Sequence, residues 1–420
     1  MNGSGASGVE PNPTDATTDR RALLAVAATF AANAGVYGSL LPRFPQLADR
    51  LDAGEAAFGL ALLGGGLGGL IGSTLMPTVV RRLGGFVPTI RWAVPVMLLG
   101  GVATGLAPSL VVFGLAMLVM GLADGVLDPA MNELALGEQQ RRGRSVMGRM
   151  HATWSGTTTA AVGVGTLLAA ADVPVGLHVG VVAAVMGLLQ LVVGRGLRER
   201  TQGAAAHADP GEPTPTERGS LREGLWVRPG PLLTVGAVGV MGVAAAWVEV
   251  PPQDWSALLL SRELGASAGL AGAGPLVFVG GVFLGRTVMD RLVDRFGGRR
   301  VAIGAGLASL VGVSAGLVTT ASTGSPWPLL VGLLLGGLGA SPVFPLMFTA
   351  GDAAAQRLGR PAGTGGSLVS AASRLGFLSS PVLVGFVAER LDLVVALAIT
   401  PLGALLMLAT LPRMLRAADR

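Results

Sequence analysis

The 420-residue chain contains no cysteine and no lysine, and only 13% of its residues are charged. Without cysteine it can form no disulfide, no thiolate nucleophile and no cysteine-ligated zinc site. Its three histidines, His151, His178 and His207, lie far apart, so a histidine-rich metal site is not expected. No phosphate-binding loop is visible, and no cofactor is predicted. Soluble domains carry about 25% charged residues, so this scarcity of charge argues against a soluble protein.

Hydrophobic residues make up 51% of the chain and gather in long uncharged blocks. A block of about 20 apolar residues can cross the roughly 30 Å hydrocarbon layer as a helix. The blocks lack the alternation of membrane strands, and lipid-facing spans must be helices or closed barrels. We therefore predict an all-α polytopic membrane protein with twelve transmembrane helices, over about residues 22–47, 56–80, 88–107, 110–135, 146–170, 176–194, 230–260, 266–290, 300–321, 327–350, 364–388 and 392–412.

Every basic residue is arginine, and the arginines are distributed unevenly between the two sets of loops. If the N-terminus is cytoplasmic, the cytoplasmic segments hold 25 of the 30 arginines, including those of the 286–300 stretch, and the outer side holds four. Basic short loops mark the cytoplasmic side. We therefore predict a multi-pass protein of the cell membrane with both termini cytoplasmic. The pI near 11.1 then reflects membrane topology, and no nucleic-acid partner is expected.

The chain divides into two similar halves. A shift of 213 residues aligns Gly72–Val87 with Gly285–Arg300, and seven of the sixteen pairs are identical. The same shift aligns a Gly-x-x-x-Gly sequence in the first half with one in the second half. Glycines four residues apart let helices approach closely in lipid. Such parallel repeats are typical of transporters with a midplane site between the halves. The predicted organisation is a disordered cytoplasmic tail (1–19), a six-helix bundle (20–195), a cytoplasmic linker (196–228), a second six-helix bundle (229–412) and a cytoplasmic tail (413–420).

The densest group of charges is MDRLVDRFGGRR, at residues 289–300. It resembles the loop signature of the major facilitator superfamily (MFS), G-x-L-A-D-R-x-G-R-R, with one extra glycine and with Asp290 where glycine is usual. The first copy, MPTVVRRLGGF, matches less well, because Arg81 stands at the Asp position. The residues of the second copy that match the signature are Leu292, Asp294, Arg295, Gly297, Arg299 and Arg300.

Shorter stretches narrow the resemblance towards the fucose-permease-like members of the superfamily. They are LPRFPQL (41–47), DPAMNE (128–133), GRMHATWS (148–155) and EVPPQDWS (249–256). The resemblance implies the MFS fold, with two pseudo-symmetric six-helix bundles, over nearly all of residues 20–412.

The charges of the signature favour a cytoplasmic gate. Asp290 and Asp294 lie one helical turn apart, as do Arg291 and Arg295, so opposite charges can pair along and between helix ends. Carboxylates favour helix N-termini and arginines favour helix C-termini, each by roughly 0.3–1 kcal/mol. The alternative is charge that only sets topology, but acidic residues add nothing to the positive-inside rule. The predicted gate comprises Asp290, Arg291, Asp294, Arg295, Gly297, Arg299, Arg300, Arg81 and Arg82.

Several polar residues fall within predicted spans, where a charge costs about 2.5–3.5 kcal/mol and therefore faces a cavity or a partner. Asp124, Asp128 and Asn132 are spaced by four and form one stripe. Asp124 is the leading candidate for a protonatable site, whereas a substrate role and a structural ion pair are equally favoured for Asp128. Glu249, beside a break at Pro251 and Pro252, is the second candidate.

Two arginines within the predicted membrane region require partners. Arg374 is predicted to neutralise Asp124 or Glu249, or to bind an anionic substrate. Arg43 is predicted to pair with Asp254 at an outer gate. The remaining candidates for a cavity lining are Asn33, Tyr37, His151, Trp154, Trp247 and Gln253.

The favoured function is secondary active transport by alternating access. The predicted partners are the lipid bilayer, protons and a small polar solute, a sugar or an organic acid, handled by a monomer; Arg374 argues against a neutral sugar. One alternative is proton-driven efflux of a drug-like metabolite, although span five lacks the G-x-x-x-G-P signature of drug antiporters. An intramembrane enzyme would need a paired catalytic constellation, and a transport-silent sensor would need a signalling domain, so neither is favoured.

Overall fold

The computed structural model describes residues 13–199, 229–357, 359 and 364–418, and these residues form helices joined by short turns, without a strand. The long helices fall into two groups of six. The N-terminal bundle contains α1 (Pro13–Leu40), α3 (Glu55–Leu83), α4 (Phe86–Leu106), α5 (Leu110–Arg142), α6 (Met147–Ala170) and α7 (Val175–Val193), with the short α2 (Phe44–Arg50) between α1 and α3.

The C-terminal bundle has the same number of spans, two of which are interrupted. Its spans are α9 (Pro229–Leu258), α10 (Ala268–Phe296), α11 (Gly298–Thr323), α12 with α13 (Pro326–Ala340, Val343–Arg357), α14 (Thr364–Arg390), and α15 with α16 (Leu393–Ala396, Ile399–Ala418).

Eleven of the described helical segments are long and apolar enough to cross a membrane. The twelfth span is α6, which has 24 residues but includes His151, Trp154 and a run of threonines that make it more polar. It packs against α1 and α10, and its threonines and Trp154 are buried or half-buried, whereas His151 is exposed. The predicted all-α fold with twelve membrane helices is therefore confirmed.

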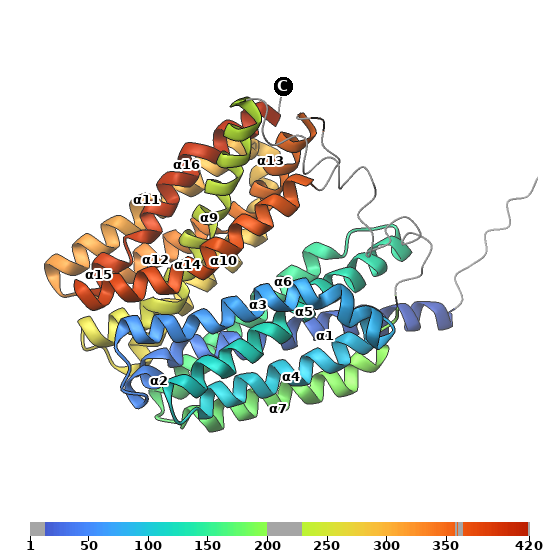
Figure 1. Ribbon diagram of the computed structural model, residues 1–420, viewed down its shortest axis with the longest axis horizontal. Coiled ribbons are helices and arrows are strands. Elements are labelled where there is room, and N and C mark those ends of the chain that lie inside the picture. The colour runs from blue at the N-terminus through green and yellow to red at the C-terminus, as the bar shows by residue number, and fades with distance from the viewer. Residues whose placement is uncertain (1–12, 200–228, 358, 360–363, 419–420) are drawn as a thin grey trace, which may run out of the picture.

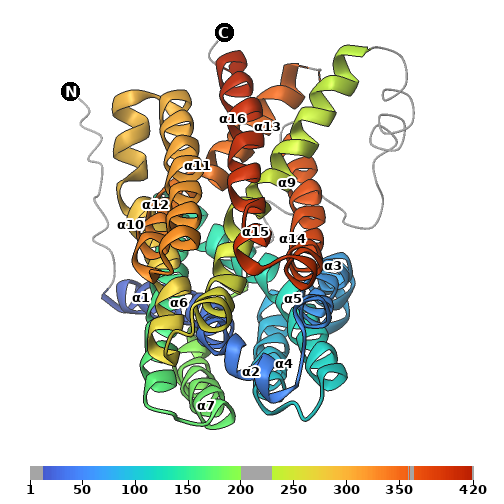
Figure 2. The same cartoon turned by 90° about the vertical axis from the view of Figure 1, so that its left-hand side faces the viewer.

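The two bundles touch at one end and diverge towards the other (Figure 1). Helix α1 begins and helix α16 ends at the diverging end, which we call the termini end; the opposite end is the contact end. Seen from the contact end, the N-terminal bundle lies below the C-terminal bundle (Figure 2). Between the bundles, α3 packs on α14 and α6 packs on α10.

The 213-residue repeat is visible in the backbone. Asp52 (φ 48°) and Gly265 (φ 60°) adopt positive φ in the turns before α3 and α10, and they occupy equivalent repeat positions. Gly84 (φ 83°) and Gly297 (φ 80°) do the same after α3 and α10. Positive φ is uncommon outside glycine, with Asp among the exceptions, so the two halves repeat the same unusual turns.

Within each bundle, glycines allow two helices to pack with their backbones in contact. A Cβ atom on Gly68 of α3 would lie 2.2 Å from the carbonyl oxygen of Leu118 on α5. At the equivalent position, a Cβ on Gly281 of α10 would lie 2.7 Å from the carbonyl oxygen of Leu334 on α12. The repeated Gly-x-x-x-Gly steps thus serve the close helix approach predicted for them.

The helix ends differ from the predicted tails. Helix α1 begins at Pro13 and so includes residues 13–19, which we had assigned to a disordered tail. Proline fits the first position of a helix because its missing N–H would be unpaired there. Helix α16 runs to Ala418 and takes in most of the predicted tail 413–420. Residues 200–228 of the predicted linker lie outside the described residues.

Candidate functional site

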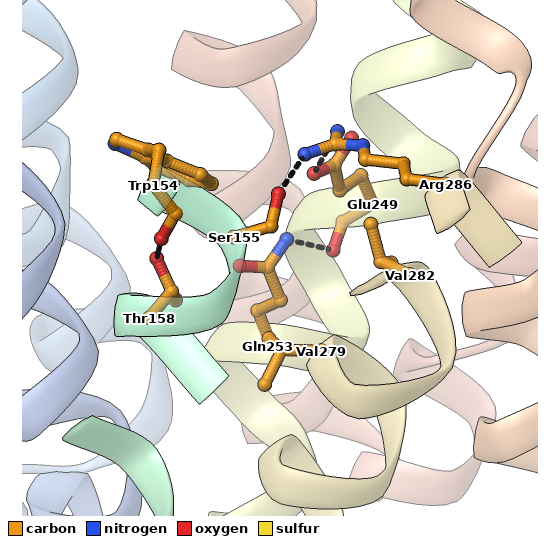
Figure 3. Close-up of a pocket in the computed structure, with 8 residues that line it drawn as sticks. All are labelled: Trp154, Ser155, Thr158, Glu249, Gln253, Val279, Val282 and Arg286. Carbon is orange, nitrogen blue, oxygen red and sulfur yellow. Dashed lines mark hydrogen bonds and ion pairs between the residues drawn. The ribbon is translucent and has the colours of Figure 1, made fainter. Parts of the chain in front are cut away.

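A pocket lies between the bundles, near the middle of α10 (Figure 3). Its empty volume is about 240 Å³, including the part that is open to solvent. Three helices line it. They contribute Trp154, Ser155 and Thr158 from α6, Glu249 and Gln253 from α9, and Val279, Val282 and Arg286 from α10.

Arg286 is the polar centre of this pocket and connects the two bundles. Its Nη1 donates a hydrogen bond to Ser155 Oγ at 2.8 Å, and its Nη2 lies 3.8 Å from Glu249 Oε1. The Gln253 side-chain amide donates to the backbone carbonyl of Glu249 at 3.1 Å. Figure 3 shows these groups converging on one space. Because Ser155 belongs to the N-terminal bundle, the Arg286–Ser155 bond crosses the interface.

Arg286 was missed as a site residue by the sequence analysis. It lies next to the charge-dense 289–300 stretch, and we counted it among the arginines of the cytoplasmic segments, although it falls within the predicted span 266–290. Helix α10 continues to Phe296 and places Arg286 more than two turns from this end, in the lining of the pocket. The signal that was available is the repeat: the position equivalent to Arg286 in the first half is Ser73, also in mid-helix.

A second polar chain joins Asp124 to the pocket. Trp154 Nε1 donates to Asn33 Oδ1 at 2.8 Å, and Asn33 Nδ2 donates to Asp124 Oδ1 at 2.6 Å. Asn33 is only 7% exposed. Within the described part of the chain, Asp124 has no ion-pair partner. Three predicted candidates on α1, α5 and α6 are therefore brought together.

The predicted pair of Arg43 with Asp254 is wrong. Arg43 is fully buried, and it donates from Nε to His178 Nδ1 at 3.3 Å and from Nη1 to Gln46 Oε1 at 2.6 Å. The 3₁₀ turn Leu41–Arg43 sends this side chain into its own bundle. Asp254 instead accepts a hydrogen bond from the Tyr37 hydroxyl at 2.8 Å, which is another contact across the interface.

The two carboxylate partners predicted for Arg374, Asp124 and Glu249, are also wrong, whereas its binding of an anionic substrate stays a prediction. Glu249 faces Arg286, and Arg374 donates to Ser73 Oγ on α3. The interface thus carries two Arg-to-Ser hydrogen bonds, one between α10 and α6 and one between α14 and α3. Between described residues, no hydrogen bond or ion pair joins the bundles on the termini side of these two bonds.

The remaining candidates lie away from the pocket. Trp247 donates to Ser379 Oγ at 3.0 Å inside the C-terminal bundle. His151 is exposed, with its ring edge-on to Phe30 at 5.7 Å. Asn132 donates to the carbonyl of Asp128 at 2.8 Å on its own helix.

The contact end is held by a cluster that the sequence analysis did not single out. Arg262 lies 2.7 Å from Glu55 Oε1 and 3.0 Å from Asp49 Oδ1, and it also donates to the carbonyl of Ala53 at 3.0 Å. Glu389 accepts the first-turn N–H of Ala56 at 3.1 Å and so caps α3 from the opposite bundle. Asp49 and Arg262 occupy equivalent repeat positions, so the repeat was again the available signal.

The predicted gate residues lie at the opposite, termini end. Asp290, Arg291, Asp294 and Arg295 are exposed, and none of them enters an ion pair among the described residues. Arg295 lies over the ring of Phe296, 5.3 Å from its centroid. Gly297 provides the positive φ between α10 and α11, and Arg299, Arg300, Arg81 and Arg82 flank the same end. Their role as a gate remains a prediction.

A further acidic residue at the termini end holds part of the N-terminal bundle together. Glu138 is 1% exposed and pairs with Arg141, with Arg142 at 3.4 Å and with Arg198 at 3.9 Å. Next to it, the Glu199 carboxylate accepts the N–H groups of Phe86 and Val87 at the start of α4, at 3.1 and 2.7 Å.

No family model matches the chain, but related proteins do. It is 29% identical to an uncharacterized transporter of Sinorhizobium fredii (strain NBRC 101917 / NGR234), over 87% of this chain and 90% of that protein. It is also 29% identical to an uncharacterized MFS-type transporter of Yersinia pestis, over 84% of this chain and 86% of that protein.

Solved structures of transporters superpose on most of the chain. The nucleoside transporter NupG does so with a TM-score of 0.67 at 13% identity, over 96% of this chain and 99% of that one. The D-xylose-proton symporter gives 0.66 at 16% identity, over 96% and 98%. The fold is that of the major facilitator superfamily. A bacterial homologue of the human lysosomal transporter Spinster, in an inward-facing and unoccupied conformation, gives a TM-score of 0.61 at 16% identity, over 98% of this chain and 95% of that one.

The MFS fold, the spanning helices and these relatives together describe a multi-pass membrane protein that is similar to MFS-type transporters. The two related proteins are named as transporters and not as enzymes.

Proposed function

We propose that the chain is a secondary active transporter that moves a small polar solute by alternating access through the pocket between its bundles. The observation that carries this proposal is the Arg286 contact. One guanidinium, deep in helix α10, donates to Ser155 of the opposite bundle and faces Glu249 of its own. Charged side chains at this depth are costly unless they face a partner or a polar cavity. The interface that must open and close therefore contains the polar site.

The contacts between the bundles fit one conformation of a transport cycle, in which one end of the protein is closed. The contact end is joined by Arg262 with Glu55 and Asp49, and the ribbons diverge at the termini end (Figure 1). We place the termini end in the cytoplasm of the cell, because it carries most of the arginines. The conformation is then inward-facing. Return to the outward-facing state requires the contact-end bonds to break and the 289–300 charges to pair with the other bundle.

We further propose that transport by the monomer is coupled to protons, with Asp124 as the proton site. Asp124 accepts a hydrogen bond from neutral Asn33, whose amide oxygen is bonded to Trp154 at the pocket. A change in the charge of Asp124 would change the hydrogen bond that the Asn33 amide donates to it. Because the same amide accepts a hydrogen bond from Trp154, the position of the indole that lines the pocket would change as well. The solute classes favoured by the sequence are a sugar or an organic acid, and the fucose-permease-like members are the favoured subfamily.

The experiment uses purified protein in proteoliposomes on a solid-supported membrane, with sugars and organic acids applied at several pH values. Wild type is compared with Asp124→Asn, with Glu249→Gln, and with Asp172→Asn in an exposed loop as the matched control. We expect a solute-evoked current in the wild type and the control, with no current in Asp124→Asn. Coupling at Asp124 is refuted if that variant carries the wild-type current, and the transport proposal fails if no solute moves.

A further inference from the structure

The ion pair in the pocket is longer than the two ion pairs that Arg262 makes across the interface. Arg262 and Glu55 lie 2.7 Å apart, whereas Arg286 and Glu249 lie 3.8 Å apart. Charge-assisted hydrogen bonds between such groups are normally about 2.7–2.9 Å long. The two charges of the pocket therefore attract each other without a direct hydrogen bond. Arg286 has five N–H donors, and the bond to Ser155 is its one hydrogen bond among described residues.

The pocket is also balanced in charge. Its lining contains one guanidinium and one carboxylate and no other ionisable group. A ligand with a single charge would satisfy one of them and leave an uncompensated charge at this depth, which is costly. A ligand with one charge of each sign can satisfy both at once.

We infer that the solute is amphoteric, with a carboxylate that binds Arg286 and an ammonium that binds Glu249. This inference rests on the proposed function and narrows the class of organic acid to an amino-acid-like zwitterion. The two charges of an α-amino acid are attached to neighbouring carbon atoms, so they suit two protein charges that are 3.8 Å apart.

The remaining lining of the pocket fits a member of this class with a short side chain. Val279 and Val282 form an apolar wall for a short side chain. Thr158 and Gln253 supply neutral polar groups next to it, so the two charged residues dominate the choice of ligand.

The test measures binding to the full-length purified protein by isothermal calorimetry with matched ligands. The first set is L-serine, L-glycerate, which lacks the ammonium, and ethanolamine, which lacks the carboxylate. Equivalent sets are built on L-alanine and L-valine, and D-xylose represents neutral solutes. We expect at least one amino acid to bind at least about tenfold more tightly than its hydroxy-acid and amine counterparts, as one lost charge-assisted contact implies. The inference is overturned if no amino acid binds, or if a singly charged or neutral ligand binds equally well.

Two variants test the assignment of each charge. Glu249→Gln should remove the preference for the amino acid over its hydroxy acid, and Arg286→Gln should remove the preference over its amine. Arg413→Gln and Asp172→Asn change exposed residues outside the pocket and should keep both preferences. Each preference is a ratio measured within one variant, so partial loss of folded protein cancels. Unchanged ratios in both pocket variants would overturn the inference even if an amino acid binds.

Uptake of the same radiolabelled ligands into proteoliposomes separates this inference from the proposed function. Amino-acid binding without uptake of any ligand refutes transport and supports the amphoteric site. Uptake of D-xylose without amino-acid binding supports transport and overturns the amphoteric site.

Discussion

Replacement of Arg262 should loosen the contact end and change the balance between the two conformations of the protein. The Arg262–Glu55 bond is 2.7 Å long with both side chains 22% exposed, so we assign it about 1–2 kcal/mol. Asp49 is 61% exposed, and its bond adds about 0.5 kcal/mol at most. Arg262→Gln should therefore cost the contact-end-closed state about 2 kcal/mol, or roughly thirtyfold in the equilibrium. A minor state populated at 1:99 would rise to about one molecule in four.

The assay measures the distance between two spin labels by pulsed electron–electron double resonance. The chain has no native cysteine, so introduced cysteines are labelled uniquely. Asp172→Cys and Thr323→Cys place labels on exposed sites of opposite bundles at the contact end. Arg144→Cys and Arg357→Cys do the same at the termini end. Arg262→Gln should add a longer distance at the contact end and a shorter one at the termini end.

Arg50→Gln is the matched control. Arg50 lies at the same end, but its bonds to the carbonyls of Gly105 and Ala107, at 3.0 and 3.2 Å, stay within the N-terminal bundle. It should leave both distance distributions unchanged. If Arg262→Gln also leaves them unchanged, the cluster does not hold the contact end closed and the argument is refuted.

Three further predictions concern stability and the pocket. Gly121→Ala should lower the free energy of unfolding by about 2 kcal/mol or more, because the new Cβ would lie 2.1 Å from a carbonyl oxygen of α3. Gly148→Ala is the control, since its Cβ would have no atom within 4 Å, and it should leave Tm unchanged. Equal Tm values for the two variants would contradict this prediction. Glu199→Gln should lower Tm by removing the charge at the start of α4, for about 0.5–1 kcal/mol, and an effect that does not shrink in high salt would exclude this electrostatic cause. Trp154→Phe should weaken solute affinity about fivefold by removing the bond to Asn33, and unchanged affinity would show that this bond does not shape the pocket.

The fold could be predicted from the sequence because lipid imposes one dominant pattern. Uncharged blocks long enough to span a bilayer must be helices, so even α6, the most polar span, was predicted at 146–170 and lies at Met147–Ala170. The ends of helices were less accurate. Helix α5 was expected to end near residue 135 and continues to Arg142, because polar residues can extend a helix beyond the hydrocarbon layer.

Several residues of the site could be predicted from the sequence, but the contacts between them could not. Glu249, Gln253 and Trp154 were chosen as polar residues within apolar spans, and all three line the pocket. Pairing depends on which helix faces which, and spacing within one helix carries no information on this. Arg286 was therefore counted with the cytoplasmic arginines and not as a site residue, and Arg43 was paired with a carboxylate that lies on the other bundle.

The contact between Asp49 and Arg262 has a consequence for how such a protein can be built. Residues at equivalent positions of two repeats meet when they lie beside the two-fold axis that relates the repeats. A dimer of two identical half-chains would bring Asp against Asp or Arg against Arg at that point, with like charges only a few ångströms apart. Opposite charges can meet there only when the halves differ in sequence. This ion pair is thus available to a single fused chain and is denied to any symmetric homodimer of either half.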